Sequence, residues 1–434
     1  MAARETALNV LIAVRKEAAW SNGILKNYIQ RDKLSPKDAA LATRLCYGVL
    51  QNQALLDAYL KQLLTGRLKD LHPVVRDILH LGLYQIYKMD KIPDSAAVNE
   101  SVQLAKKYCK FPKAPGLVNA VLRNAVRTAG QLKMPDGYAE KYSHPQELID
   151  FLKPYVGKEH LAPMLEANNE IPPMTVQVNL KKISLDGLRE QLTQEGVEVR
   201  PHSVFPQCLI LENTGNIEQL PSFRDGLFYV QDGAAWLSVQ CAGIRERDKV
   251  LDCCAAPGGK SFAAAICGAE EIHSCDIHPH KVELLKKGAQ RLGFDNIYPE
   301  HRDATEFVPQ WEEQMDIVIA DVPCSGYGII RKKPDIRYKL PKTMEELPEL
   351  QLSILENQAR YVKVGGTLLY STCTLAYREN EGVVEEFLQT HPEFKLVPLP
   401  LPENIAQTRE GMLRLIPGEY DTDGFFICRM RRER

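Results

Sequence analysis

The chain of 434 residues lacks features that define several classes of protein. It has no run of 18 apolar residues, so no segment is long and apolar enough to cross a membrane as a helix. Its 11 cysteines include no Cys-x-x-Cys pair and follow no regular spacing. A chain of this length does not need disulfide staples, so we expect free thiols in a reducing compartment. Asn9 and Arg15 interrupt any apolar run of a signal peptide, which predicts a cytoplasmic protein.

The sequence also has almost no net charge and no repeats or low-complexity tracts. Its 44% apolar and 25% charged residues exclude a mainly disordered chain, a collagen and a coiled coil. The net charge of −2 is unevenly distributed, because residues 1–140 hold 21 Lys and Arg against 12 Asp and Glu. A basic front of net +9 and an acidic remainder of net −11 predict separate tasks for the two parts.

Hydrophobic periodicity predicts three regions. Residues 1–140 show almost no strand pattern, and helix starts such as Ser35-Pro36, His72-Pro73 and Pro93-Asp94 predict an all-α domain of five to seven helices. A polar segment at 131–145 indicates a linker. Residues 146–232 predict a small α+β subdomain.

Residues 233–434 alternate between strand and helix patterns, which predicts a parallel sheet covered on both faces, an α/β architecture. The expected strands are 250–252, 271–276, 296–302, 316–321, 366–371 and 424–430, and the expected helices are 260–267, 281–292, 345–362 and 379–388.

A glycine-rich segment, Cys254-Ala-Ala-Pro-Gly-Gly-Lys-Ser261, follows the first of these strands. Small residues let the backbone approach a ligand closely, and the first N–H groups of the next helix attract an anionic group. Cys254 stands where a Walker A loop needs glycine, and the pattern Gly-x-Gly-x-x-Gly is absent. The segment therefore predicts a cofactor loop, but not that of a nucleoside triphosphatase.

Aspartates end the next three strands. Asp276 lies 24 residues after Asp252, where an acid can bind both hydroxyls of a ribose. Asp303 is suited to accept a hydrogen bond from an adenine amino group, and Asp321 ends the fourth strand. Singly, Asp276 and Asp303 are equally well explained as helix caps or turn residues. As a series they predict an adenosine-containing ligand with a short charged tail, which S-adenosylmethionine matches better than NAD.

Two cysteines lie in unusual settings. Cys324, in Asp321-Val-Pro-Cys-Ser-Gly326, follows the fourth strand, and Cys373, in Ser371-Thr-Cys-Thr374, follows the fifth. The carboxyl ends of parallel strands meet at one edge of a sheet, so we expect both thiols beside the glycine-rich loop. Most buried cysteines are inert, but loops of this kind are where reacting groups belong. The other cysteines, Cys253 included, are predicted to be structural.

These motifs resemble those of the RNA 5-methylcytosine methyltransferases of the Sun/Fmu class. The helical part resembles the RNA-binding NusB domain in Cys46-Tyr-Gly48, Ala97-Val-Asn-Glu100 and Gly116–Arg123. This pairing of domains is similar to that of the enzymes that modify bacterial small-subunit ribosomal RNA, and the resemblance spans nearly the whole chain. Thr374 stands where the family usually has serine, and Tyr338 lies in a segment that tends to hold tryptophan.

The resemblance implies a Rossmann-like methyltransferase domain at 233–434, S-adenosylmethionine as cofactor and 16S ribosomal RNA as partner. Cys373 would add to C6 of a cytosine and so make C5 nucleophilic. Cys324 would help to remove the C5 proton and release the enzyme; the family alone supplies this order, because the chemistry permits either. The cofactor positions that it implies are Cys254, Ala255, Ala256, Pro257, Gly258, Gly259, Lys260, Asp276, Asp303 and Asp321, the last also near the base. We expect a monomer.

Other polar clusters allow two explanations. Arg331–Lys333 and Arg337, with Tyr327 and Tyr338 interleaved, suit stacking on RNA bases or a solvated loop. Arg429–Arg434 is either a frayed solubilising tail or an RNA contact. The segment 273–280 holds three histidines, a cysteine and an aspartate, but no second ligand pair at zinc spacing, so we expect no metal.

Two alternative functions stay open. The catalytic motifs are equally compatible with a transfer RNA cytosine C5-methyltransferase, and only the NusB-like front favours ribosomal RNA. A non-catalytic NusB-like RNA-binding scaffold is the other alternative, against which the intact cysteine motifs argue.

Overall fold

The computed structural model describes residues 2–17 and 21–434 of the chain. Its contacts divide the chain into two compact units. The first, here called the helical unit, comprises Met1–Phe151, Leu165–Ile171 and Ile330–Leu340. The second, here called the sheet unit, comprises Leu152–Met164, Pro172–Ile329 and Pro341–Arg434.

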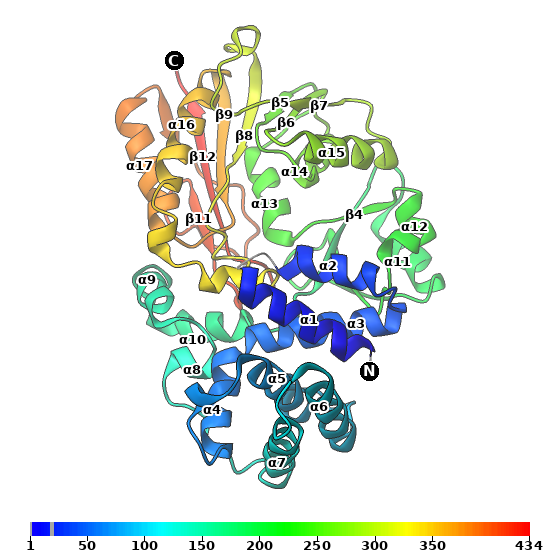
Figure 1. Cartoon of the computed structure of the whole chain (residues 1–434). Coiled ribbons are helices and arrows are strands. Elements are labelled where there is room, and N and C mark those ends of the chain that lie inside the picture. The colour runs from blue at the N-terminus through cyan, green and yellow to red at the C-terminus, as the bar shows by residue number, and fades with distance from the viewer. Residues whose placement is uncertain (1, 18–20) are drawn as a thin grey trace. The chain divides into compact units, whose positions relative to one another are not determined.

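The helical unit is built from helices that start where the sequence predicts them. The Ser35 hydroxyl caps α3 by accepting a hydrogen bond from the Asp38 N–H at 3.2 Å, and Pro36 takes the first helical position. Leucines such as Leu8, Leu45 and Leu122 are fully buried in one core. The helices are α1 (Ala2–Glu17), α2 (Ser21–Arg31), α3 (Pro36–Gln51), α4 (Gln53–Leu63), α5 (Pro73–Lys88), α6 (Asp94–Tyr108), α7 (Ala114–Arg127) and α8 (Tyr138–Lys141), with a 3-10 turn at Leu68–Asp70 (Figure 1).

The segment 131–145 is more than the polar linker that the sequence predicts. It contains α8, and it ends at Ser143 and His144, which are both buried. The Ser143 hydroxyl accepts a hydrogen bond from the Leu55 N–H, 3.0 Å away. A polar side chain of this segment thus forms a hydrogen bond with a buried backbone N–H. The composition of the segment does not reveal this role. Two further helices, α9 (Gln146–Val156) and α10 (Lys158–Ala167), lie where the chain leaves this unit and returns to it.

A segment from late in the chain completes the helical unit. Residues 330–340, which contain the 3-10 helix Pro334–Tyr338, bring the Arg337 guanidinium into its interior with no solvent exposure. One Arg337 nitrogen, Nη1, donates to the carbonyls of Gln51 and Ser143 and to Asn169 Oδ1, each at 2.9 Å, and Nη2 donates to the Asn168 carbonyl at 3.2 Å.

This burial changes the interpretation of the basic segment after Cys324. Arg331, Arg337 and Tyr327 are 3%, 0% and 1% exposed, so the predicted stacking of these side chains on RNA bases is wrong. Tyr338 is 42% exposed, although its hydroxyl donates to the Leu50 carbonyl at 3.1 Å. Arginines that serve buried carbonyls have the same sequence signature as arginines that face RNA.

The sheet unit begins with a small antiparallel sheet of four strands in the order β2-β3-β1-β4. Leu188 and Leu192 pack α11 against its buried residues, including Phe228. This is the α+β subdomain that the sequence predicts. Its elements are β1 (Met174–Val178), α11 (Leu185–Gln194), β2 (Glu198–Pro201), β3 (Cys208–Glu212), a 3-10 turn at Ile217–Gln219, α12 (Pro221–Arg224) and β4 (Phe228–Val230).

The large sheet follows, with the strand order β10-β12-β9-β8-β5-β6-β7 and β11 paired to β12. The five strands from β9 to β7 are parallel, as predicted. Its strands and 3-10 turns are β5 (Lys249–Asp252), β6 (Glu271–Asp276), β7 (Ile297–His301), Pro309–Trp311, β8 (Met315–Asp321), Pro341–Thr343, β9 (Val362–Thr372), Tyr377–Glu379, β10 (Phe394–Leu396), β11 (Met412–Leu415) and β12 (Phe425–Arg432).

One edge of this sheet departs from the prediction of a wholly parallel sheet. β12 runs antiparallel to β9, β10 and β11. The stretch between β11 and β12 is too short for the crossover helix that parallel strands need. Arg429–Arg432 belong to β12, so the prediction of a frayed tail is wrong for these residues.

Helices cover both faces of the large sheet, as Figure 1 shows. Successive residues point to opposite faces: Val250 contributes to one buried cluster and Leu251 to the other. The helices are α13 (Gly233–Ala242), α14 (Gly259–Cys267) and α15 (Pro279–Leu292) against the first cluster, and α16 (Leu347–Ala359) and α17 (Glu381–Thr390) against the second. Among the described helices none is long and apolar enough to span a membrane.

Candidate active site

The strand order brings the predicted site residues to one edge of the large sheet. β5, β6, β7, β8 and β9 are parallel neighbours, so their carboxyl ends share an edge. The glycine-rich loop leaves β5 there, Asp276 and Asp321 end β6 and β8, and Asp303 follows β7. Cys324 and Cys373 follow β8 and β9. All of these residues lie within the sheet unit.

The glycine-rich loop packs closely against the Phe262 ring and against β6. Gly258 has φ +112°, and a Cβ on it would lie 2.4 Å from the Phe262 ring, so only glycine fits. The Ala255 N–H donates to the Cys275 carbonyl at 2.7 Å, which ties the loop to β6. The helix α14 then starts at Gly259 with no acid in its first turn. Its first N–H groups have no intrahelical acceptor, which favours an anionic ligand at this end.

Beneath the loop lies a buried acid that sequence reasoning used only as a spacing marker. Asp252 is fully buried at the end of β5, and its Oδ2 accepts a hydrogen bond from the Ser261 hydroxyl at 2.8 Å. The Ser274 hydroxyl donates to that of Ser261 at 2.7 Å. Burial raises the pKa of Asp252 to about 7, and the Ser261 hydrogen bond and Lys260 only partly oppose this. The sequence signal for this buried acid is its position: Asp252 directly follows the apolar residues Val250 and Leu251 of the strand.

Asp276 and Asp303 each bind their own turn with one carboxylate oxygen. Asp276 Oδ1 accepts from the His278 N–H at 2.9 Å, and Asp303 Oδ1 accepts from the N–H and hydroxyl of Thr305 at 2.9 and 2.7 Å. Among the described residues no hydrogen-bond partner is found for Oδ2 of either. Each aspartate thus acts as a turn residue through Oδ1, while its Oδ2 is available to bind a ligand.

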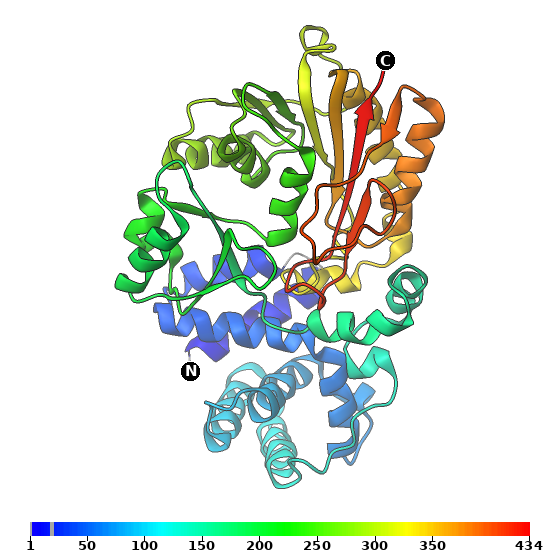
Figure 2. The ribbon, with the colours of Figure 1, turned by 180° about the vertical axis from the view of Figure 1, so that it is seen from behind.

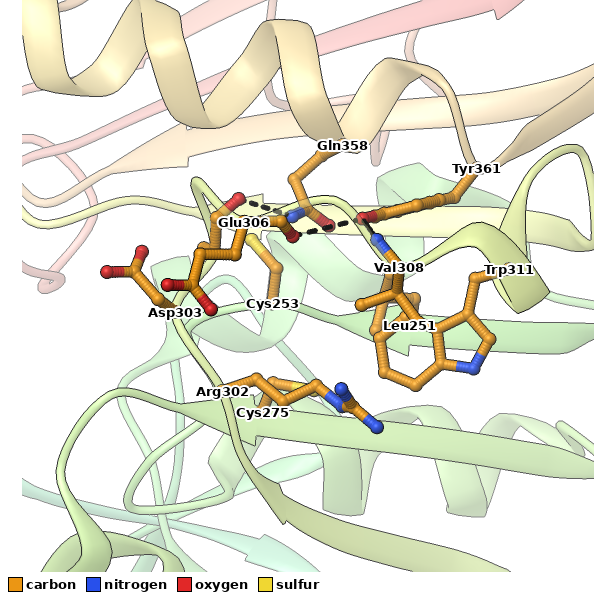
Figure 3. A pocket seen from close by; sticks show the side chains of 11 residues that line it. Leu251, Cys253, Cys275, Arg302, Asp303, Glu306, Val308, Trp311, Gln358 and Tyr361 are labelled. Atoms are coloured by element: carbon orange, nitrogen blue, oxygen red, sulfur yellow. Dashed lines mark hydrogen bonds between the residues drawn. The ribbon is translucent and has the colours of Figure 1, made fainter.

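A cavity of about 370 Å³ lies beside these two residues. Asp303 and Glu306 line it, together with Phe307 and with Ile277, which is 51% exposed directly after Asp276. A smaller space of about 10 Å³ reaches inward to Cys253 and Cys275, and Figure 3 shows the carboxylates of Asp303 and Glu306 close together on one side of it. His301 and Arg302 also line the cavity, so its lining is mixed: apolar side chains for a planar base, and charged groups of both signs for polar atoms.

Asp321 is held by two hydrogen bonds. Its Oδ2 lies 2.6 Å from Lys260 Nζ, and its Oδ1 accepts from the Ser371 hydroxyl at 2.8 Å. Lys260 is largely buried, and its ammonium also lies 5.2 Å from the centre of the Phe425 ring. The predicted loop lysine is therefore directed at Asp321. This fixed ion pair presents a charged, oriented carboxylate three residues before Cys324.

The two cysteines form a pair. The sulfurs of Cys324 and Cys373 are 3.3 Å apart, and both side chains are partly exposed. The hydrogen bond with Cys373 and burial raise the pKa of Cys324 well above its ordinary value, with the charges of Glu379 and Asp321 adding to the effect. Cys324 therefore retains its proton at neutral pH and can donate it toward the Cys373 sulfur.

Backbone and hydroxyl contacts clamp the two cysteine loops together. The Ser325 and Thr374 hydroxyls, each next to a cysteine, are 2.7 Å apart. The Gly328 N–H donates to the Cys373 carbonyl at 2.9 Å. A Cβ on Gly328 would lie 2.0 Å from the Gly424 carbonyl oxygen, so this approach requires glycine. Thr374, the departure from the family pattern, supplies the hydroxyl that this clamp uses.

Glu379 and Asn380 support the clamp, and sequence reasoning missed both. Glu379 Oε2 accepts from the Ser325 N–H at 2.8 Å and from Gln351 Nε2 at 3.0 Å. Burial raises the pKa of Glu379, and these hydrogen bonds oppose the rise. Asn380 bonds the Thr372 hydroxyl and the Thr374 carbonyl, one residue on either side of Cys373. Glu379 and Asn380 could have been found in the sequence by one signal, which is that both are polar and lie within eight positions of Cys373.

The histidine-rich segment after β6 has a structural role at its first position. The two ring nitrogens of His273 lie 2.9 Å from Glu300 and 3.0 Å from Glu271. In the part of the chain that the structure describes, no group of three or more His, Cys, Asp or Glu side chains is arranged to hold a metal ion.

A five-stranded parallel core with an antiparallel edge, a glycine-rich loop after β5 and acids at the next strand ends defines a Rossmann-like methyltransferase. Family comparisons agree: residues 239–431 match 16S rRNA methyltransferase RsmB/F, residues 1–127 the NusB family, and residues 144–218 the ferredoxin-like domain of RsmF/B-like methyltransferases. The resemblance seen in the sequence is thereby confirmed, together with the predicted fold class.

The chain belongs to the RsmB/F family of 16S rRNA methyltransferases, and several relatives that match nearly all of it are named small subunit methyltransferase B. It is 37% identical to the probable ribosomal RNA small subunit methyltransferase B of Bacillus subtilis, over 99% of this chain and 98% of the relative. It is 32% identical to ribosomal RNA small subunit methyltransferase B of Escherichia coli K12, over 92% of each.

Solved structures share the fold. The crystal structure of PH0851 has a TM-score of 0.77 at 24% identity and covers 98% of this chain and 97% of that one. NSun6 from Pyrococcus horikoshii, solved with SFG, has a TM-score of 0.60 at 20% identity and covers 67% of this chain and 98% of that one.

Proposed function

We propose that this protein transfers a methyl group from S-adenosylmethionine to C5 of a cytosine in 16S ribosomal RNA through a covalent adduct on Cys373. The observation that carries the proposal is the pair of sulfurs 3.3 Å apart at the ends of neighbouring strands, beside the glycine-rich loop. Two thiols at one point suit a reaction that needs a nucleophile and a second group to release it. The family membership supports the methyl transfer.

The residues present fit S-adenosylmethionine. The free Oδ2 of Asp276 suits the ribose hydroxyls, and Asp303 with the apolar wall at Ile277 suits the adenine. The first N–H groups of α14 suit the carboxylate of the methionine part, with residues 254–260 forming the loop around it. When bound, this cofactor supplies an electrophilic methyl group.

We assign different roles to the two sulfurs, in the order that the family resemblance implies. Cys373 is the sulfur that attacks, and the raised pKa of Cys324, which keeps Cys324 protonated in the free enzyme, supports this assignment. Its electron pair forms a bond to C6 of the cytosine, and C5 becomes nucleophilic and takes the methyl group. Cys324 first gives its own proton to water, which reaches its partly exposed side chain. The Cys324 thiolate then takes the C5 proton, and the C6–sulfur bond breaks to return the electron pair to Cys373. The same raised pKa makes the Cys324 thiolate a strong base.

Asp321 orients the base in this proposal. Lys260 and Ser371 fix its carboxylate in place three residues before Cys324. A carboxylate held in this way accepts a hydrogen bond from the exocyclic amino group of cytosine, which uracil lacks. The ion pair thereby favours cytosine over uracil.

The choice of 16S ribosomal RNA rests on the names of the relatives and on the NusB match at residues 1–127. Transfer RNA remains the alternative substrate, because nothing at the cysteine pair distinguishes the two RNAs. A non-catalytic scaffold is disfavoured, because the clamp of Ser325, Thr374 and Glu379 keeps both thiols in a reactive arrangement.

The test is transfer of labelled methyl from S-adenosylmethionine to purified small-subunit RNA, with bulk transfer RNA in parallel and Cys373→Ala as control. Product nucleosides are identified by mass spectrometry. We expect label in 5-methylcytosine of the ribosomal RNA and none with the variant. Label confined to transfer RNA would change the substrate, and label in a base other than cytosine would contradict the proposed chemistry.

A further inference from the structure

The opposite edge of the large sheet holds a second cavity, of about 240 Å³. It lies where β8 and β9 begin, so the seven residues of β8 separate it from the cysteine edge by about 23 Å at the rise of a strand. β12 ends at this edge, near the C-terminus of the chain (Figure 2). Four of its lining residues are basic: Arg245, Lys363, Arg429 and Arg431.

The two acids in this cavity differ in their partners, and only Asp316 is paired with a charged side chain. Asp316 binds Lys363 Nζ through both oxygens at 3.0 and 3.1 Å, and Asp248 accepts a hydrogen bond from the backbone N–H of Arg245 at 2.7 Å. In residues 2–17 and 21–434 no carboxylate pairs with the guanidinium of Arg245 or of Arg431. Four basic and two acidic side chains line the cavity, so its lining carries a net charge of +2.

Arg429 shows that the cluster is built into the fold. Its Nε is buried without a hydrogen-bond partner, and its Nη1 donates only to the Pro398 carbonyl at 3.2 Å. The Arg429 guanidinium packs beside Gly243, which ends α13 with φ +72°; a Cβ there would lie 2.9 Å from Arg429 Nη2. Arg245 and Arg431 line the same cavity as Arg429. Burial lowers the pKa of Arg429; Cys241 opposes this, and the charges of Arg431 and Arg245 add to it.

We propose that this cavity binds a backbone phosphate of the substrate RNA and is a second RNA contact on the edge opposite the cysteine pair. Guanidinium groups match phosphate oxygens in geometry and charge, and a bound phosphate would relieve the repulsion among the three arginines. The same chemistry fits free inorganic phosphate, and the test separates the two. The proposal rests on RNA being the substrate, and it gives Arg429 and Arg431 of the basic C-terminal segment a ligand.

The test compares the full-length wild type with the double variant Arg245→Gln, Arg431→Gln. Both side chains are exposed and unpaired, so the fold should survive; the single variant Arg431→Gln serves if the double variant unfolds. The measurement is affinity for 16S ribosomal RNA over a series of salt concentrations. We expect about tenfold weaker binding for the double variant, and a salt dependence lower by about one released counterion for each lost phosphate contact.

The matched control removes two exposed charges elsewhere on the sheet unit, with Lys286→Gln and Lys287→Gln on α15. This control should bind RNA like the wild type. Equal affinity and equal salt slope for the arginine variant and the wild type would overturn the proposal. So would binding of inorganic phosphate by the wild type that the variant loses while its RNA affinity is unchanged, because the site would then take a free anion.

Methyl transfer and S-adenosylmethionine binding, measured on the same proteins, keep the two proposals apart. A wild type that binds RNA but forms no 5-methylcytosine contradicts the proposed function, and the comparison of RNA affinities still decides on the phosphate site. A wild type that does not bind RNA overturns both.

Discussion

The two cysteine loops begin alike and are held differently. Each follows a buried parallel strand, and each carries a hydroxyl residue directly after its cysteine. The Cys324 loop is fixed through the Ser325 N–H by a buried carboxylate, Glu379, whereas the Cys373 loop is fixed through its own carbonyl by Gly328. Only Cys324 therefore has a carboxylate bonded to the residue next to it. The same side chain at equivalent strand ends therefore has different surroundings, and our proposal gives the two cysteines different chemical roles.

The largest effect is expected from removing Cys373. In our assignment Cys373→Ala leaves no nucleophile, so methyl transfer should fall by more than about 1,000-fold. The assay is formation of 5-methylcytosine under saturating S-adenosylmethionine. A variant that keeps a tenth of the wild-type rate would make Cys324 the nucleophile and reverse the comparison.

Cys324→Ala should stop the reaction at a later point. The adduct forms but its C5 proton has no acceptor, so turnover should fall by about 100-fold or more, and RNA should remain attached to the protein. Denaturing electrophoresis with labelled RNA measures the adduct, and the double variant Cys324→Ala, Cys373→Ala is the control. An adduct in Cys373→Ala instead would show that the roles are exchanged.

Glu379→Gln tests whether the Glu379 carboxylate raises the pKa of the Cys324 thiol. The Glu379 carboxylate helps to raise the pKa of Cys324, so a neutral side chain should lower that pKa and move the corresponding limb of the pH–rate profile to lower pH. We also expect about a tenfold lower kcat with little change in KM for S-adenosylmethionine. A lower kcat with an unshifted profile would leave Glu379 as a support for the Ser325 backbone alone.

The hydroxyl clamp predicts an intermediate effect. Thr374→Val removes the hydrogen bond between the Ser325 and Thr374 hydroxyls, while the Ser325 hydroxyl keeps its hydrogen bond to Glu379, so we expect a loss of about 0.5–1.5 kcal/mol of stability. Thr374→Ser keeps the hydroxyl and should resemble the wild type in both thermal unfolding and rate. If valine and serine behave alike, the clamp does not hold the two loops together.

The smallest effect on the rate is expected at Asp252, which contacts neither cysteine. Its raised pKa means that folding stabilises its protonated form, so its contribution is complete below pH 4 and is lost as the pH rises through about 7. The slope is at most about 1.4 kcal/mol per pH unit for one group. Asp252→Asn should therefore flatten the pH dependence of unfolding between pH 4 and 7, as measured by denaturant titration; an unchanged slope would contradict it.

The sequence predicted the features that depend on neighbours along the chain. The helix starts at Ser35-Pro36 and His72-Pro73, the glycine-rich turn and the residues that end β6 and β8 are local signals, and they were found. Features that depend on distant partners were not. Glu379 matters because Ser325, 54 positions earlier, donates to it, and the antiparallel β12 follows from connection lengths that periodicity does not show.

Arg337 has partners that lie far from it along the chain, and this distance affects the order of events during synthesis. Its partners at Gln51, Ser143, Asn168 and Asn169 are synthesised long before it, because the chain must extend from Ile171 to the segment Ile330–Leu340. At ~5–20 residues per second, translation of that stretch takes roughly 10 to 30 s. During this interval the nascent helical unit holds open carbonyls where a guanidinium will later sit. Its completion therefore reports that about the first half of residues 233–434, up to Arg337, has been synthesised, while β9 and Cys373 are still to come.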